Sequence, residues 1–228
     1  ANNEIGVLQP IRAIAQLCRA RGIRFHCDGA QAVGHIPLQP AELGIDLLSI
    51  SGHKLYGPKG IGALVVAADV RLAPQLHGGS QERGLRAGSL PLPLIVGLAK
   101  ALELALADQT VRAERLAALR DRLWQRLQTL GGIHRNGAAS PRLAHNLSIW
   151  IEGVDSAGLQ RALRPSLALS SGSACSSGEP SHVLQALGLS RQQAATALRF
   201  GLGRRTSAAE IDTAAELVSA AVTELRHR

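Results

Sequence analysis

The sequence contains few of the residues that mark secreted, metal-binding or membrane proteins. It has three cysteines and no methionine in 228 residues. Cys18, Cys27 and Cys175 lie far apart and form no C-x-x-C pair, which argues against a zinc site or a disulfide framework and fits a reducing compartment. No apolar run reaches about 18 residues and no charged-then-apolar segment opens the chain, so we expect neither a membrane span nor a secretory signal. These absences predict a soluble, cytoplasmic protein.

Aromatic residues are also rare, with two Trp, one Tyr and two Phe. Lys and Arg outnumber Asp and Glu by 25 to 17, which gives a formal net charge of +8. This charge raises the possibility of nucleic-acid binding. The arginines, however, are spread along predicted helices, and no basic run alternates with aromatic residues. A solvated helix face is therefore the better interpretation, and we expect no direct contact with nucleic acid.

Strands and helices alternate along the chain, which predicts an α/β fold. We expect strands at 23–28, 46–51, 61–67, 145–153, 166–170 and 196–203, and helices at 11–21, 156–163, 180–188 and 207–228. One long helix is expected from about 92 to 130, and Ser207 is the expected cap of the last helix. Near 131–145 the pattern changes from one long helix to short strands alternating with helices. This change predicts two domains, 1–130 and a smaller α+β domain of 131–228.

Two of the predicted strands end in polar residues that suit chemistry. Asp28 and Gln31 follow the first, in "FHCDGAQAVG", and Ser51, His53 and Lys54 follow the second, in "SISGHKLYGPKG". A strand-end lysine in an apolar setting loses its proton more easily and attacks carbonyls, although an isolated lysine is more often surface charge. A carboxylate can keep a pyridine nitrogen protonated, and hydroxyl and imidazole groups can bind a phosphate. Together these are the groups that pyridoxal 5'-phosphate requires. "GPKGIG" lacks the G-x-x-x-x-G-K-[ST] pattern, so we discount a nucleotide loop.

Cys175 differs from the other cysteines in its surroundings. It lies in "SSGSACSSGEP", and a loop of such small residues buries little and leaves a thiol accessible. Cys18 and Cys27 fit the alternative role of small buried hydrophobic residues. His26, two positions before Asp28, is expected to face the other side of its strand. The other histidines show no ligand spacing, so we expect no metal site.

Six motifs occur in order along the chain: "NNEIG", "HCDGAQAVG", "SGHKLYGPKGIGAL", "HGGSQERGLRAGSLP", "SSGSACSSG" and "LRFGLGR". Together they resemble the cysteine desulfurases of the NifS/IscS type, and the resemblance covers essentially the whole chain. It implies the fold of a fold-type I pyridoxal phosphate-dependent transferase. Residues 1–130 would belong to the large mixed-sheet domain with its bridging helix, and 131–228 would form the small C-terminal α+β domain with the catalytic cysteine.

The resemblance implies a cofactor site at the two strand ends. Lys54 would form the Schiff base with pyridoxal 5'-phosphate, and Asp28 would pair with the pyridine nitrogen. Gln31 would approach the ring hydroxyl, while Ser51 and His53 would bind the phosphate.

Other roles follow from the same resemblance. Asn3 would lie near both cofactor and substrate, and Ser89 would reach the phosphate of the partner subunit in a homodimer. Arg199 would hold the substrate carboxylate through a bidentate contact, for which a guanidinium is suited. Lys54 would take the Cα proton of L-cysteine, and Cys175 would attack the substrate sulfur, leaving a persulfide and L-alanine.

The implied partners are a sulfur-acceptor or scaffold protein in iron–sulfur cluster assembly or tRNA thiolation. The alternatives are a related lyase or aminotransferase, such as a selenocysteine lyase or a kynureninase-like enzyme, and a non-catalytic remnant that only dimerises or binds a partner. Cys175 favours a desulfurase, because aminotransferases do not need a loop thiol.

The sequence departs from the family pattern in three places. The family's N-terminal segment, with a Gly-Ala-Thr-type phosphate turn and a histidine over the cofactor ring, is absent. Ser176 stands where threonine is more usual, and no long tail follows the last helix. We therefore expect a cofactor pocket that lacks one wall and a sheet with an exposed edge.

Overall fold

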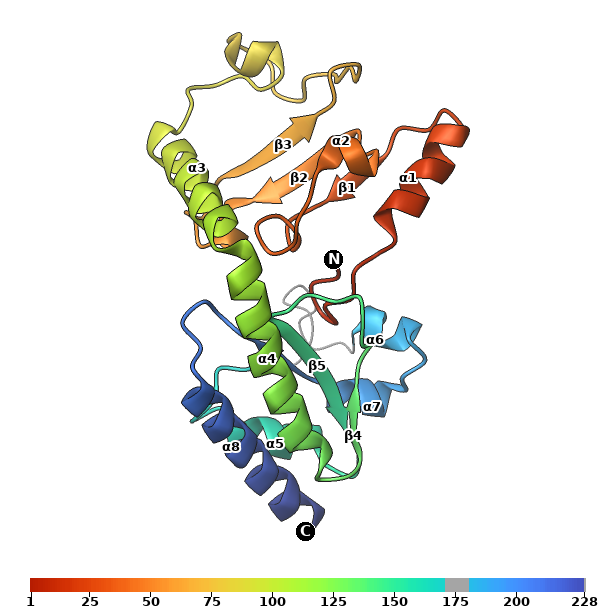
Figure 1. The fold of residues 1–228 in the computed structure, drawn as a ribbon, viewed down its shortest axis with the longest axis vertical. Helices are drawn as coiled ribbons and strands as arrows, with labels where there is room; N and C mark the ends of the chain where they lie inside the picture. The colour runs from red at the N-terminus through yellow and green to blue at the C-terminus, as the bar shows by residue number, and fades with distance from the viewer. Residues whose placement is uncertain (171–180, 228) are drawn as a thin grey trace. The chain divides into compact units, whose positions relative to one another are not determined.

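The computed structural model describes residues 1–170 and 181–227 and divides the chain into two compact units (Figure 1). The Lys54 unit is Pro10–Gln109, and the Arg199 unit is Ala1–Gln9 together with Thr110–Arg228. These units differ from the expected domains of 1–130 and 131–228. The Arg199 unit includes the first nine residues of the chain, and it also includes residues 110–130, which were expected in the first domain. The domain assignment itself stays a prediction.

A mixed three-stranded sheet with the order β1-β2-β3 forms the centre of the Lys54 unit (Figure 1). Its elements are α1 (Ile11–Ala20), β1 (His26–Asp28), α2 (Pro40–Leu43), β2 (Leu47–Ser51), the 3-10 turn η1 (Gly52–Leu55), β3 (Gly62–Val66), η2 (Gln81–Gly84) and α3 (Leu92–Ala107). β1 runs parallel to β2, with Asp28 opposite Ser49, whereas β3 runs antiparallel to β2. The parallel pair is what a crossover through α2 requires.

The core of the Lys54 unit is small and lies on one side of the sheet. Leu48 of β2 packs with Leu55 of η1 and Leu98 of α3, and Cys27 of β1 packs against this cluster. β3 is covered poorly on both faces, since Leu64 is 47% exposed and Val65 is 43% exposed. β1 and β3 are the edge strands of this sheet.

An antiparallel sheet with the order β4-β5-β6 forms the centre of the Arg199 unit. Its elements are α4 (Gln109–Gln128), β4 (Ile133–Arg135), β5 (Asn146–Ile151), α5 (Ser156–Leu163), α6 (His182–Ala186), α7 (Arg191–Ala195), β6 (Leu198–Gly201) and α8 (Ala208–Arg226). Figure 1 shows α4, α5 and α8 gathered together on this unit.

The alternation of side chains along β5 separates two layers, because successive residues of a strand face opposite sides. Leu147, Ile149 and Ile151 join a cluster formed with leucines of α4 and α5 and apolar residues of α8. On the other face, Trp150 packs against the cluster around Ile5, Leu184 and Ala194, which come from the N-terminal segment, α6 and α7. β5 is therefore buried on both faces and anchors the unit.

Polar contacts fix α8 at its start and along its length. Ser207 caps its first turn in a capping box with Glu210, as the sequence predicts. Both carboxylate oxygens of Asp212 accept hydrogen bonds from Arg122 of α4, at 2.8 and 2.6 Å. The pKa of Asp212 lies below its usual value because of this arginine. These contacts hold α4 and α8 side by side over the sheet.

Several expected elements differ in the structure. The long helix of about 92–130 is interrupted at Asp108, whose ψ of 11° is not helical, so it forms α3 and α4. The strand expected at 166–170 is wrong, because only Ser170 makes a bridge, to Arg199. β4 and α7 were not expected. In residues 1–170 and 181–227, no helix is long and apolar enough to cross a membrane.

Replacing the fully buried Leu123 by alanine tests the core of the Arg199 unit. We expect Leu123→Ala to lower the free energy of unfolding by about 2–5 kcal/mol, because it removes apolar contact and leaves a cavity. Leu187, which is 45% exposed, is the matched control, and its alanine variant should lose about 1 kcal/mol or less. Urea unfolding followed by circular dichroism measures both, and equal losses would contradict the assigned core.

Candidate functional site

Asp28 and Ser51 stand at the ends of neighbouring parallel strands. Asp28 is the last residue of β1 and Ser51 is the last residue of β2. Because β1 and β2 run in the same direction, their carboxyl ends meet at one edge of the sheet. Open α/β sheets bind ligands at such an edge. The structure thus brings together the two strand ends that the sequence singled out.

The turn after β1 is organised by the carboxylate of Asp28. Its Oδ1 accepts the backbone N–H of Ala30 at 2.9 Å, and the N–H of Gly29 donates to Ser49 O of β2 at 2.9 Å. A Cβ at position 29 would lie 2.6 Å from a methyl group of Leu48 and 3.1 Å from Ser49 O, so a larger residue here would have to displace the packing of Leu48. Gln31 follows in this turn and is half-buried. Asp28 and Gln31 are therefore held on one short, tightly packed loop.

Lys54 lies on η1, the 3-10 turn that continues β2. Leu55 anchors the turn, since it is only 3% exposed and packs in the core of the unit, whereas His53 and Lys54 are exposed. The turn ends at Tyr56 in the left-handed region, with φ 63°. The backbone N–H of Gly57 then donates to Gly52 O at 3.0 Å. One buried leucine thus fixes a turn whose two basic side chains point away from the core.

Two histidines contribute contacts that the sequence did not predict. His26 was expected on the other side of its strand from Asp28, which is wrong, because residues two apart in a strand share a face. Cys27 between them packs against the core, while His26 and Asp28 are exposed, and His26 Nε2 lies 2.7 Å from Ser49 Oγ. His35 Nε2 lies 3.2 Å from Lys54 O and so links the loop after β1 to the lysine turn.

Ser89 lies in the segment between η2 and α3 and is exposed. The preceding turn η2 contains Glu82 and Arg83 in the left-handed region, and an isolated bridge joins Leu76, before η2, to Arg86, after it. The backbone N–H of Gly88 donates to Gln81 Oε1 at 3.1 Å. Ser89 is therefore presented on the surface of the Lys54 unit, next to a turn held by local hydrogen bonds.

Asn3 and Arg199 come together in the Arg199 unit, although 196 positions separate them in sequence. The guanidinium of Arg199, on β6, donates to Asn3 O at 2.8 Å through Nη1 and to Ser170 Oγ at 3.0 Å through Nη2. The asparagine that the sequence placed near the substrate and the arginine that it assigned to the substrate carboxylate are thus adjacent in space.

The N-terminal segment that carries Asn3 is fastened firmly to the Arg199 unit. Asn146 Nδ2 donates to Glu4 O at 3.3 Å, and Arg142 donates to Ile5 O at 2.8 Å. Gly6 has φ 75°, and a Cβ there would lie 2.8 Å from Asn146 Oδ1. Burial, with Arg120 adding to it, lowers the pKa of Arg142 to about 10, so this arginine stays charged at neutral pH. Asn3 is therefore presented from a rigid support.

The two cysteines that the structure describes fit structural roles. Cys18 and Cys27 are half-buried, and Cys27 packs against the core of the Lys54 unit. Burial raises the pKa of the Cys27 thiol, and the nearby charge of Asp28 adds to this effect. A raised pKa makes the reactive thiolate scarcer. Cys175 lies outside the described residues, so its role stays a prediction.

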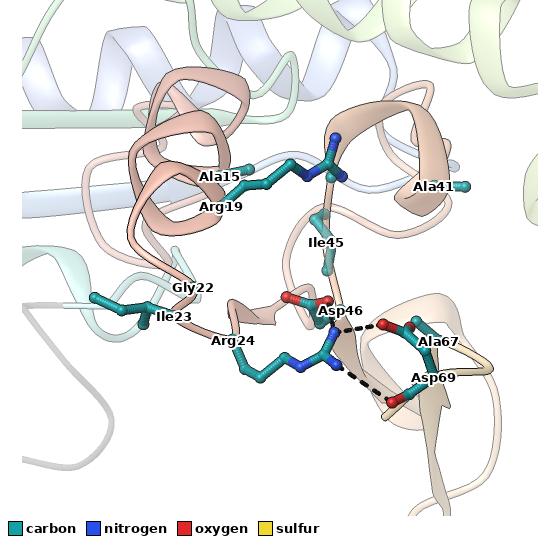
Figure 2. A pocket seen from close by; sticks show the side chains of 11 residues that line it. Ala15, Arg19, Gly22, Ile23, Arg24, Ala41, Ile45, Asp46, Ala67 and Asp69 are labelled. Atoms are coloured by element: carbon teal, nitrogen blue, oxygen red, sulfur yellow. Dashed lines mark hydrogen bonds and ion pairs between the residues drawn. The ribbon is translucent and has the colours of Figure 1, made fainter. Parts of the chain in front are cut away.

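A surface pocket of about 430 Å³ lies at the other end of the same strands, where β1 and β2 begin (Figure 2). Arg24 precedes β1 and Asp46 precedes β2, and Arg24 donates to Asp46 at 3.0 Å and to Asp69 at 2.8 Å. The pKa of Asp46 lies below its usual value, mainly because its carboxylate accepts a hydrogen bond from the backbone N–H of Phe25. The hydrogen bond from Arg24 is the second cause. No site residue predicted from the sequence lines this pocket. Because Arg24 and the two carboxylates satisfy one another, they form a structural clamp at the start of the strands.

Comparison with known proteins identifies the family. The aminotransferase class-V family matches residues 1–213. The chain belongs to this family. It is 49% identical over 230 residues to the cysteine desulfurase IscS of Histophilus somni and 50% identical over 229 residues to that of Pasteurella multocida. The matches cover 99% of this chain but only 57% and 56% of those proteins, so the chain spans little more than half their length.

A solved structure agrees with this membership. A NifS-like protein superposes with a TM-score of 0.89 and 32% identity, over 99% of this chain and 60% of that protein. The resemblance to the NifS/IscS type and the expected fold-type I architecture are thereby confirmed.

Sequence reasoning missed two contacting residues of this class-V chain. His35 contacts Lys54 O, and Ser170 contacts Arg199. His35 carried no spacing signal, because its partner is a backbone carbonyl 19 positions away. Ser170 opens the motif "SSGSACSSG", and its position within a quoted motif was a signal that could have been used.

Alkylation of Cys27 tests the assignment of this thiol to the core. Because its pKa is raised in the folded protein, less thiolate is present at any given pH, and modification should be slow. We expect the rate of iodoacetamide modification to rise at higher pH in the folded chain than in the urea-unfolded chain, which is the matched control. Mass spectrometry of the Cys27 peptide gives both rates. If the modification rate of the folded chain rose at the same pH as that of the unfolded chain, or at a lower pH, the assigned environment of Cys27 would be wrong.

Proposed function

We propose that the protein containing this chain is a pyridoxal 5'-phosphate-dependent cysteine desulfurase. It converts L-cysteine to L-alanine and keeps the sulfur as a persulfide. The observation that carries the proposal is the 49% identity to IscS of Histophilus somni over 99% of this chain. Because the chain spans 57% of that relative, the activity is proposed for the whole protein. The chemistry of the strand-end residues supports the same conclusion.

The donor groups of the Lys54 unit fit the proposed cofactor. An exposed primary amine and an imidazole stand on one turn, and a carboxylate stands at the end of the adjacent parallel strand. We assign Lys54 to the covalent bond, Asp28 to the ring nitrogen and Gln31 to the ring hydroxyl, with Ser51 and His53 on the phosphate. When bound, pyridoxal phosphate supplies an electron sink for the electron pair released at the substrate Cα.

Lys54 and Arg199 handle the substrate. The Lys54 amine takes the proton from Cα of L-cysteine and so acts as the general base. Asp28 stabilises the protonated ring nitrogen through its negative charge. Arg199 binds the carboxylate of the substrate, and Asn3 lies beside it. A guanidinium suits this role because its planar donors match the two oxygens of a carboxylate.

Cys175 accepts the sulfur. Its thiolate attacks the substrate sulfur, so an S–S bond forms while the C–S bond of cysteine breaks. The electron pair of the broken bond remains on Cβ, which takes up a proton, and L-alanine leaves. One cysteine and one protein thiol thus become one alanine and one persulfide, with no external oxidant. A thiolate is needed because a hydroxyl is a far weaker nucleophile toward sulfur.

The protein works as a homodimer in this proposal and passes its sulfur onward. Ser89 is exposed on the Lys54 unit, which supports its assignment to the phosphate of the partner subunit. The sulfur goes to an acceptor or scaffold protein in iron–sulfur cluster assembly or tRNA thiolation, in the cytoplasm. The names of the IscS relatives support the desulfurase step from which such a transfer begins.

Lys54→Ala tests the covalent bond to the cofactor. The variant should lose the long-wavelength absorbance that pyridoxal phosphate gains on bonding to the protein, and alanine production should fall to background, because no other group replaces the amine. Lys59→Ala, at an exposed lysine five positions later, is the matched control and should keep both. The absorption spectrum and alanine production are measured on this chain and on the chain joined to the part of IscS that it does not span. An unaltered spectrum in Lys54→Ala would rule out the assignment.

Cys175→Ser tests the desulfurase reaction itself. The variant should bind pyridoxal phosphate and L-cysteine but form no persulfide, and alanine production should fall at least about 100-fold, since the nucleophile is lost. Cys18→Ser is the control and should retain activity. Mass spectrometry after incubation with L-cysteine should find one added sulfur on the peptide that contains Cys175. Added sulfur on Cys18 or Cys27, or full desulfuration by Cys175→Ser, would refute the mechanism.

A further inference from the structure

Ser170 is tied to Arg199 by both its backbone and its side chain. The N–H of Arg199 donates to Ser170 O at 2.8 Å, and the N–H of Ser170 donates to Arg199 O at 3.4 Å. These two bonds form an isolated antiparallel bridge beside β6. The side chain of Arg199 then donates to Ser170 Oγ at 3.0 Å. Three hydrogen bonds therefore join one serine to the arginine that is assigned to the substrate.

The Ser170 hydroxyl restricts a side chain that is otherwise mobile. An arginine side chain has several rotatable bonds, and holding it in one geometry costs conformational entropy. Asn3 O accepts from Nη1 and Ser170 Oγ accepts from Nη2, so the guanidinium is held at two of its nitrogens. This preorganisation is present before any substrate binds, which lowers the entropic cost of binding a carboxylate.

Both acceptors, Asn3 O and Ser170 Oγ, are neutral, so they do not balance the positive charge of Arg199. Arg122, by contrast, donates to both oxygens of Asp212, so its charge is already balanced. A carbonyl and a hydroxyl orient a guanidinium without cancelling its positive charge. Arg199 thus remains able to attract an anionic group such as a carboxylate.

We propose that Ser170 is a positioning residue whose hydroxyl holds the Arg199 guanidinium in the orientation that accepts the α-carboxylate of the substrate. The inference rests on the proposed function, and it extends that function to a residue without an assigned role. It predicts that loss of the hydroxyl weakens the binding of carboxylate-bearing ligands and leaves the chemical step intact.

The test compares Ser170→Thr with Ser170→Val in the complete, cofactor-loaded protein. Both residues are β-branched and similar in size, but only threonine keeps the hydroxyl. Because a hydrogen bond to a charged group is lost, we expect Ser170→Val to raise the KM for L-cysteine about tenfold, with kcat within about twofold of wild type. Ser170→Thr should restore most of the affinity. Ser219→Ala, which removes a hydroxyl that donates to Ala215 O on α8, is the control and should leave KM unchanged.

Two further readouts separate positioning from general damage. Calorimetry should show L-alanine binding weakened about tenfold in Ser170→Val, while binding of ethylamine, which lacks the carboxylate, stays equal to wild type. In the Arg199→Ala background, adding Ser170→Val should change neither KM nor L-alanine affinity, because the partner through which it acts is gone.

The possible failures are distinguishable. A wild-type protein that makes no alanine from L-cysteine would overturn the proposed function and this inference with it. An active wild type with an unchanged KM in Ser170→Val would overturn the inference alone. The inference would also be overturned if Ser170→Val weakened the binding of ethylamine as much as that of L-alanine. It would be overturned as well if Ser170→Val kept its full effect on KM in the Arg199→Ala background, or if Ser170→Thr failed to recover the affinity.

Discussion

The parallel pairing of β1 with β2 is the constraint on which the candidate cofactor site depends. Parallel strands end at the same edge of a sheet, so the side chains that follow them converge whatever the sequence distance between them. With Asp28 opposite Ser49, the loop of Asp28 and the turn of Lys54 are built on adjacent strand ends. A shift of register by one residue would turn Asp28 to the core side, where Cys27 now packs. The apolar packing of Cys27 and Leu48 therefore fixes the position of the Asp28 carboxylate.

The Arg199 unit meets a different requirement, which is to hold a long cationic side chain without neutralising it. β5 is buried on both faces and provides the rigid support for β6. The N-terminal segment is fastened beside the same sheet by backbone and asparagine contacts, which brings Asn3 O to the guanidinium. Elsewhere in the unit, arginines pair with carboxylates to join helices. The difference in partners separates these helix-joining arginines from Arg199, whose described acceptors are the neutral Asn3 O and Ser170 Oγ.

The two units of this chain differ in the size of their apolar cores. The Arg199 unit has a large cluster of buried side chains, contributed by the helices α4, α5 and α8 and the strands β4, β5 and β6. The Lys54 unit has five buried residues at its centre and leaves β3 exposed on both faces. Small cores stabilise a fold weakly, because burial grows with the amount of chain that is packed. The clamp of Arg24 with Asp46 and Asp69 ties the starts of its strands together.

The sequence by itself determined the family and most of the local structure. The order of the motifs identified the family, and local signals placed the strand-end residues, the amphipathic helices and the Ser207 cap, because these depend on neighbouring residues and on side-chain period. It did not determine the break at Asp108, the three-residue strand β4 or the five-residue helix α7, because elements this short show little periodicity. The capping box of Ser190 and Gln193 was a local signal for α7 that could have been used. Only the tertiary structure decided that Arg199, Asn3 and Ser170 meet, and that His35 contacts the carbonyl of Lys54. In these contacts a side chain meets a distant partner, which is a backbone carbonyl for Asn3 and Lys54 and a hydroxyl for Ser170. A backbone carbonyl has no signature in the sequence, and no local pattern gives the distance between residues far apart in the chain.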